Sequence, residues 1–361
     1  MHSHPEAADT LIVGAMLYDG TGAPPVERDV ALRDGRIVAI GNLSNWLAEE
    51  VIEANGRALA PGFIDVHTHD DTHVIRAPQM LPKISQGVTT VVVGNCGISA
   101  SPVTLQGDPP DPMNLLGERD AFSYPTFSAY VDAVNAARPA VNVGALIGHT
   151  ALRNNHMNDL KRAATGDEIA AMRAQLADAL AHGALGLSTG LAYGSAFEAS
   201  TEEVASLAQP LAAAGAVYTT HMRTEFDAIL EAMNEAYHIG KHARVPVVIS
   251  HLKCAGPSNW GRSAEVLASL ESARKYQPVG CDCYPYSRSS STLDLKQVTG
   301  DIDITITWST PHPEQAGKLI KEISAGGGVS QQEAAKRLQP AGAVYHNMSE
   351  VDVRRILAHP A

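Results

Sequence analysis

From Gly62 onward, short apolar runs rich in β-branched residues alternate with longer Ala-rich stretches, and this alternation constrains the fold more than any other feature. The apolar runs are continuous, as expected for parallel strands that are covered on both faces. They occupy residues 62–67, 89–95, 140–149, 184–189, 216–221, 245–251 and 278–284. The stretches between them carry capping signals at helix starts, namely Thr165-x-x-Glu168, Ser200-x-x-Glu203 and Ser330-x-x-Glu333. The pattern predicts successive βα units around a parallel sheet.

Seven such runs indicate an α/β fold of the (β/α)8, or TIM-barrel, type that is one strand short. A barrel of this type closes with eight strands. The helical stretch 348–360 lies where the helix before an eighth strand belongs, and the sequence ends at Ala361. We therefore expect a barrel that is truncated before strand eight. The alternative is an open doubly wound sheet, which needs a Gly-rich phosphate loop where this chain has His67-Thr68-His69-Asp70.

Two segments fall outside the βα pattern. Residues 1–61 predict a small antiparallel sheet, because Asp-Gly turns at residues 19–20 and 34–35 separate short strands. We assign this segment to the N-terminal part of a small β-sandwich domain. Residues 62–361 form the predicted barrel. Within it, residues 287–345 fit no βα unit, and a long insertion after a barrel strand is typical of an active-site lid.

Composition narrows the class of partner. The chain has 27 Lys and Arg against 39 Asp and Glu, a net charge of −12, so nucleic acid and anionic membranes are not expected partners. No apolar run approaches the ~20 residues of a membrane span, and the first residues lack the pattern of a signal peptide. Four cysteines make no disulfide framework in a chain of 361 residues, so we expect free thiols in the cytoplasm.

Metal-ligand side chains recur where the predicted strands end. His67 and His69, at positions i and i+2, share a face of the first strand, and Cys96, His221 and His251 close the second, fifth and sixth. An isolated His-x-His pair is also typical of solvated histidines. Because the C-terminal strand ends of a barrel share one face, the recurrence favours a zinc site, since thiolate and imidazole are ligands that zinc prefers.

Two further residues stand beside these positions. His149 also ends a predicted strand, so it is either a group that supports the metal site or substrate, or a packed polar residue. Lys253 follows His251 by two residues, where an ammonium can meet an anionic substrate beside a metal; the alternative is a surface salt bridge.

Several segments resemble the D-aminoacylases, or N-acyl-D-amino-acid deacylases, of the amidohydrolase superfamily. They are PGFIDVHTHDD, GNCGIS, GHTALR, GLSTGLAYG, THMRTE, SHLKCAG and DCYPYSRSSST, in that order. The resemblance implies one tightly bound Zn²⁺ on Cys96, His221 and His251. It implies a second, weaker or empty site at His67 and His69.

The resemblance also assigns roles in substrate binding and catalysis. It implies that Lys253, Tyr193 and Tyr284 hold the carboxylate of an N-acyl-D-amino acid. Many related enzymes bridge two metals with a modified Lys on strand four, but residues 187–190 contain no Lys. The acid/base Asp of the family is expected beyond Ala361, so no catalytic residue is identified within the chain.

These features together predict zinc-dependent hydrolysis of the linear amide bond of N-acyl-D-amino acids. The expected partner is therefore a small molecule. Two alternatives remain open: an amidohydrolase that acts on cyclic amides, and a truncated relative that binds metal without turnover.

Overall fold

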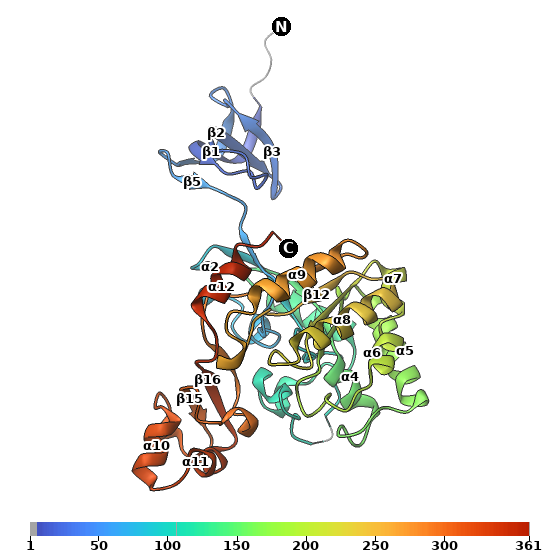
Figure 1. The fold of residues 1–361 in the computed structure, drawn as a ribbon. Helices are drawn as coiled ribbons and strands as arrows, with labels where there is room; N and C mark the ends of the chain where they lie inside the picture. Colours follow the sequence, from blue (N-terminus) through green and yellow to red (C-terminus); the bar gives the residue numbers. More distant parts are fainter. Residues whose placement is uncertain (1–5, 106, 361) are drawn as a thin grey trace. The chain divides into compact units, whose positions relative to one another are not determined.

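The computed structural model describes residues 6–105 and 107–360. The chain divides into two compact units, Met1–Phe63 and Ile64–Ala361, and each is described by itself (Figure 1).

The first unit contains one five-stranded sheet in the order β3-β2-β1-β4, with β5 also on β1. Its strands are β1 (Ala7–Leu17), β2 (Val26–Arg33), β3 (Arg36–Gly41), β4 (Leu47–Glu53) and β5 (Ala58–Leu59). Asp34 and Gly35 close the β2–β3 hairpin with φ values of 52° and 69°, as a two-residue Asp-Gly turn requires. Asp19 and Gly20 lie instead in a longer connection.

The prediction of an antiparallel sheet is wrong for half of this unit. Strand β1 pairs antiparallel with β2, but it pairs parallel with β4 and, at its far end, with β5. The strand is 11 residues long, so its second edge has room for two successive partners. The spacing of turn residues carries no information on this non-local pairing.

The second unit is built on parallel strands arranged in two sheets, β6-β7-β8 and β13-β12-β11-β10-β9. The strands are β6 (Phe63–Asp65), β7 (Val88–Val93), β8 (Asn142–Ala145), β9 (Ile147–Gly148), β10 (Gly186–Gly190), β11 (Val217–His221), β12 (Val247–Ile249) and β13 (Val279–Cys281). Each predicted run coincides with one of these strands to within three residues at either end, except that residues 140–149 contain two. Because β8 pairs with β7 and β9 pairs with β10, this run links the two sheets.

His149 does not end a strand, so that prediction is wrong. Gly148 closes β9, and His149 is the first residue of α4. The turn is possible because Gly148 lacks a side chain: a Cβ there would lie 2.6 Å from the carbonyl oxygen of Gly97.

Helices cover the parallel strands (Figure 1). They are α1 (His73–Arg76), α2 (Leu81–Ile84), α3 (Phe127–Ala137), α4 (His149–His156), α5 (Gly166–Ala181), α6 (Thr201–Leu207), α7 (Pro210–Ala214), α8 (Ile229–Ala243) and α9 (Ser263–Arg274), with 3₁₀ turns at Met113–Leu116, Arg119–Ala121, Pro257–Asn259, Leu295–Gln297 and Pro313–Gln315. Their inward faces and the strands form one apolar core. In the part of the chain that the structure describes, no helix combines the length and the apolar character that crossing a bilayer requires.

The predicted capping signals are helix starts. Thr165 and Glu168 form a reciprocal capping box on α5. Ser200 accepts a hydrogen bond from the backbone N–H of Glu203 at the start of α6, but the Glu203 carboxylate turns away from the cap.

The segment that fits no βα unit forms a substructure with its own core (orange to red in Figure 1). It contains an antiparallel sheet of β14 (Ser289–Thr292), β16 (Ala341–Tyr345) and β15 (Ile304–Ser309), together with α10 (Ile320–Gly327) and α11 (Gln331–Leu338). Its two ends meet, because the Met348 N–H donates to the Ser287 carbonyl at 3.3 Å. The chain continues into α12 (Glu350–Leu357), where the Asp352 carboxylate accepts from the N–H of Gly261 at 2.7 Å.

Candidate metal centre

Five potential metal ligands lie together at the C-terminal ends of the parallel strands. The residues are His67 and His69 after β6, Cys96 after β7, His221 at the end of β11, and His251 after β12. Their ligand atoms form two overlapping groups, and the atoms within each group lie within 4.8 Å of one another. One group is His67, His69 and Cys96; the other is Cys96, His221 and His251. The structure thus brings all five predicted ligands to one place.

Cys96 is held at this place by a tight turn after β7. Gly94 and Gly97 have φ values of 79° and 76°, and a Cβ at either would lie 2.1 Å or 2.5 Å from backbone atoms of neighbouring segments. The buried Asp71 carboxylate accepts from the N–H groups of Gly94 at 3.2 Å and Ala100 at 3.1 Å. Only glycine permits this approach, so the turn is fixed against the sheet and Cys96 with it.

The cluster stabilises a thiolate. Cys96 Sγ lies 3.1 Å from His67 Nε2 and 3.4 Å from His251 Nε2. Burial opposes ionisation, but the positive charge of these two rings outweighs it and lowers the pKa of Cys96 well below its usual range. Burial also opposes protonation of His67, yet the thiolate and Asp282 raise the pKa of His67 to about 10. Thiolate is the form that binds metal.

Two carboxylates lie against the Nδ1 atoms of His67 and His251, and neither was predicted from the sequence. Asp282 Oδ2 lies 3.1 Å from His67 Nδ1, and Asp282 Oδ1 accepts from the His251 N–H at 2.6 Å. Glu225 Oε1 lies 2.8 Å from His251 Nδ1. Carboxylates in this position orient an imidazole and leave Nε2 for the metal. Asp282 could have been found from the sequence, because it is an acidic residue within the apolar run 278–284. Glu225 lies outside every predicted strand, so no pattern points to it.

Lys253 is buried beside the ligands, so the surface salt bridge considered from sequence is wrong. The residue is 4% exposed, and its Nζ lies 2.5 Å from Glu225 Oε1 and 2.8 Å from His251 Nδ1. Burial opposes the ammonium, but Glu225 outweighs it and raises the pKa of Lys253. Nζ also lies 5.6 Å from the centre of the Tyr284 ring. A charged lysine therefore adjoins His251, and the Tyr284 ring lies beside that lysine.

Tyr193 adjoins another of the potential ligands, His221. Its hydroxyl lies 3.3 Å from His221 Nδ1, and the two ring centres are 4.7 Å apart. Burial raises the pKa of Tyr193 well above its usual range, and the hydroxyl also contacts the side chain of Ser291 in β14. The phenol therefore stays protonated between a potential metal ligand and the insertion.

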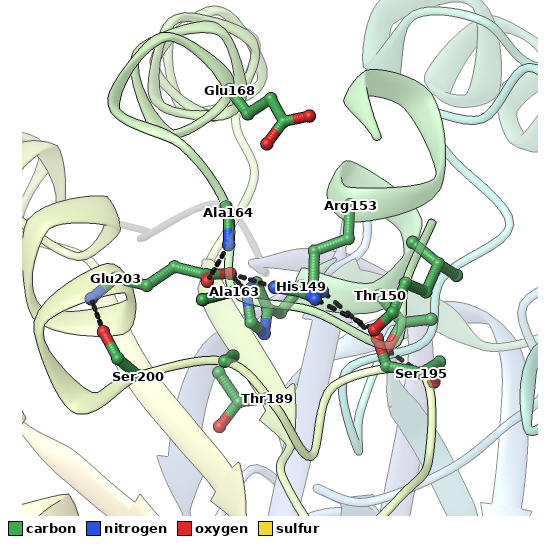
Figure 2. A network of polar contacts seen from close by, with 12 residues as sticks. His149, Thr150, Arg153, Ala163, Ala164, Glu168, Thr189, Ser195, Ser200 and Glu203 are labelled. Atoms are coloured by element: carbon green, nitrogen blue, oxygen red, sulfur yellow. Dashed lines mark hydrogen bonds and ion pairs between the residues drawn. The ribbon is translucent and has the colours of Figure 1, made fainter. Parts of the chain in front are cut away.

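His149, by contrast, belongs to a different polar network (Figure 2). Its Nε2 lies 3.0 Å from Glu203 Oε1, which also accepts from Arg153. The His149 side chain is 0% exposed, so it offers a substrate no surface. The structure favours the packed polar residue over a substrate-binding group.

The donor set fits zinc. It offers one thiolate and four imidazoles, the S and N ligands that zinc prefers. His69 Nδ1 is buried without a hydrogen-bond partner among the described residues, so a metal bound to it would satisfy it. Cys96, His67 and Asp282 are also arranged as a nucleophile, its base and the acid that orients the base. A nucleophilic cysteine needs one base, however, and a second imidazole, that of His251, lies within 3.4 Å of the sulfur. Convergence of several imidazoles on one sulfur favours a metal site.

Comparisons with known proteins agree with this geometry. A model of the Amidohydrolase family matches residues 50–347. D-aminoacylase of Alcaligenes xylosoxydans xylosoxydans is 46% identical over 350 residues, 97% of this chain and 72% of that protein. N-acyl-D-aspartate deacylase of the same organism is 47% identical over 357 residues, 99% of this chain and 72% of that protein.

A solved structure gives the same result. The structure is that of N-acyl-D-glutamate deacylase from Bordetella bronchiseptica, complexed with zinc and a phosphonate inhibitor. It superimposes with a TM-score of 0.95 at 44% identity, and the match covers 98% of this chain and 75% of that chain. The chain therefore belongs to the amidohydrolase family and has its α/β fold. The relatives named here are all deacylases of N-acyl-D-amino acids or D-aminoacylase.

Proposed function

We propose that this protein is a zinc-dependent hydrolase that cleaves the linear amide bond of N-acyl-D-amino acids to a carboxylate and a free D-amino acid. The observation that carries the proposal is the position of Lys253. Its ammonium is buried 2.8 Å from His251 Nδ1, within a metal-ligand cluster, on a chain 46% identical to D-aminoacylase.

The two overlapping groups offer two metal positions, and the resemblance to the D-aminoacylases assigns their roles. Cys96, His221 and His251 would hold the tightly bound Zn²⁺, and His67 with His69 would complete a weaker second site at Cys96. When bound, zinc supplies Lewis-acid activation of the amide carbonyl and of water. The absence of a Lys from residues 187–190 and the presence of Cys96 argue against the cyclic-amide alternative.

The substrate carboxylate would be held on the Lys253 side. Lys253 presents a cation next to His251, Tyr284 presents a phenol beside Lys253, and Tyr193 presents a second phenol next to His221. An α-carboxylate fixed there and a carbonyl fixed at the metal leave two positions at the α-carbon, one for the hydrogen and one for the side chain. If only one of these positions has room for a side chain, the site accepts one enantiomer, and we propose that this is the D form.

Proton transfer is not assigned to a described residue. Both carboxylate oxygens of Asp282 are engaged, one with His67 and the other with the His251 N–H. Glu225 is paired with Lys253. By its resemblance to the D-aminoacylases the reaction would use an Asp for this role, and we propose no counterpart for it among the described residues.

The proposal includes the finer organisation predicted from sequence. Residues 62–361 would provide seven strands of a (β/α)8 barrel, residues 1–61 part of a small β-sandwich domain, and residues 287–345 a lid over the site. The contact of Tyr193 with Ser291 supports the lid, because it joins the insertion to a neighbour of a metal ligand. All four cysteines are free, which supports a reducing cytoplasm.

The test is a zinc titration combined with turnover of N-acetyl-D-methionine and its L enantiomer. We expect stoichiometric zinc binding and hydrolysis of the D form. Zinc binding without turnover of any N-acyl-D-amino acid would instead identify a silent metal-binding relative.

Lys253→Ala tests the carboxylate contact. A charge-assisted hydrogen bond contributes about 1.5–3 kcal/mol, so KM for the acid should rise roughly tenfold to a hundredfold. KM for an N-acyl amine without the acid should change little, and the matched control Lys241→Ala, exposed on α8, should leave both unchanged. Equal losses on the two compounds would make Lys253 a structural residue.

A further inference from the structure

Loop 191–200, between β10 and α6, carries Tyr193 and is held by two arginines from other elements. Arg153 of α4 donates to the Ser195 carbonyl at 3.1 Å. Arg223, beyond β11, donates to the carbonyls of Phe197 and Ala199. Three alternate carbonyls of one loop are therefore bound by two guanidinium groups.

Arg153 joins this loop to the rest of the unit (Figure 2). Its side chain is 0% exposed, and it also donates to the Leu160 carbonyl at 3.0 Å. Glu203 of α6 neutralises it and accepts from the Ala164 N–H at 2.9 Å. Since its donors reach both the 157–164 connection and loop 191–200, Arg153 fixes the two segments relative to each other.

Arg223 joins the other end of the loop to the segment that carries a metal ligand. It lies two residues after His221 and donates to the Ala199 carbonyl at 2.9 Å. It also forms a two-pronged ion pair with Glu235 at 2.8 Å and 3.0 Å. At the start of the loop, the Leu191 N–H donates to the His221 carbonyl at 3.0 Å. Both ends of the loop are therefore bonded to residues 221–223.

We propose that Arg153 and Arg223 are positioning residues that hold the Tyr193 hydroxyl against His221 Nδ1 and thereby orient this imidazole for its metal. The inference rests on the metal site of the proposed function. His67 and His251 are oriented by the carboxylates of Asp282 and Glu225, whereas His221 Nδ1 meets the hydroxyl of a tyrosine on a loop. A loop needs an external constraint to serve as a rigid partner, and the two arginines supply it.

The decisive variant is Arg223→Lys. Its side chain is 25% exposed, so a lysine there keeps a charge beside Glu235 and reaches solvent, but it cannot bind two carbonyls and a carboxylate in the same geometry. The matched control is Arg162→Lys, which alters a similarly half-buried arginine that is 35% exposed and paired with Glu168. Among the described residues, the Arg162 side chain bonds to Ala163, Glu168 and Asn158 and not to loop 191–200.

Two measurements test the proposal. Zinc affinity, measured by competition with a chelator, should fall roughly tenfold in Arg223→Lys and in Tyr193→Phe. The zinc affinity of the double variant should be no lower than that of the weaker-binding single variant, because both changes remove the same interaction. Amide hydrogen exchange of residues 191–200 should accelerate at least tenfold in Arg223→Lys, and Arg162→Lys should match the wild type in both measurements.

Unchanged zinc affinity in Arg223→Lys, or losses that multiply in the double variant, would overturn the positioning role. Unchanged amide hydrogen exchange of residues 191–200 would show that the arginines do not restrain the loop. Neither measurement requires turnover, so absence of hydrolysis would count against the proposed function alone. Arg153→Lys provides the second arm, with the same expected acceleration of exchange across the loop.

Discussion

Glu203 should make the stability of this protein depend on acid, by an amount that follows from its contacts. The residue is 1% exposed, and its carboxylate meets His149, Arg153 and the N–H of Ala164. Burial opposes ionisation, but the hydrogen bonds from His149 and Ala164 and the charge of Arg153 hold the pKa of Glu203 at about 2, against 4.5 for an ordinary glutamate.

A carboxyl group whose pKa is lower in the folded than in the unfolded state stabilises the fold above the unfolded pKa. That stabilisation is lost as the pH falls toward the folded pKa. For Glu203 the window runs from pH 4.5 down to about 2. The difference corresponds to about 3 kcal/mol of unfolding free energy at neutral pH, of which roughly 1.5 kcal/mol is lost by about pH 3.5.

The assay is urea unfolding of wild type and Glu203→Gln between neutral pH and about pH 3.5, with a chelator present so that zinc binding does not contribute. The unfolding free energy of Glu203→Gln should lie below that of the wild type at neutral pH. The gap should narrow as the pH falls, because a protonated glutamate resembles glutamine. Glu231→Gln, an exposed change on α8, should follow the wild type throughout. A gap that stays constant over this range would refute the assignment of the ionised carboxylate to the network.

Three further outcomes are expected. Cys96→Ala should abolish tight zinc binding, since a methyl group cannot replace a thiolate ligand, and elemental analysis showing full zinc content would disprove the assignment. Glu225→Gln should weaken zinc binding roughly tenfold to a hundredfold, because His251 loses the carboxylate that orients it, and chelator competition measures this effect. The same change should lower the unfolding free energy by about 3 kcal/mol, because Lys253 is left buried without a counterion, and urea unfolding measures this loss. In metal-free protein Cys96 should react with iodoacetamide, and zinc should protect it. Cys254 should stay unmodified in either state, because burial raises its pKa to about 12. Modification of Cys96 at equal rates with and without zinc would contradict its role as a ligand.

The sequence predicted the parallel strands and the clustering of the five potential metal ligands because both depend on local signals. Continuous apolar runs mark covered strands, and a histidine or cysteine at a strand end is visible without knowledge of the fold. The pairing of β1 with β4 and β5 was missed, because it joins residues far apart in the chain.

Side-chain choices between local and distant partners were also beyond the sequence. Ser200 and Glu203 match a capping box, and the hydroxyl of Ser200 does cap α6. The Glu203 carboxylate instead meets a buried guanidinium from α4, which outcompetes an exposed backbone N–H. The same limit applies to Glu225, whose partners His251 and Lys253 come from another strand end.

The insertion between β13 and α12 behaves as an exchangeable module. It has an apolar core of its own, and its ends meet at Ser287 and Met348, so a different segment can span the same two points. None of the five metal-ligand residues lies within it. Recombination at these ends would alter what surrounds a substrate while the cluster on the parallel strands stays intact. A family with this architecture can therefore diversify in specificity by replacing one continuous stretch of gene, without re-evolving the chemistry.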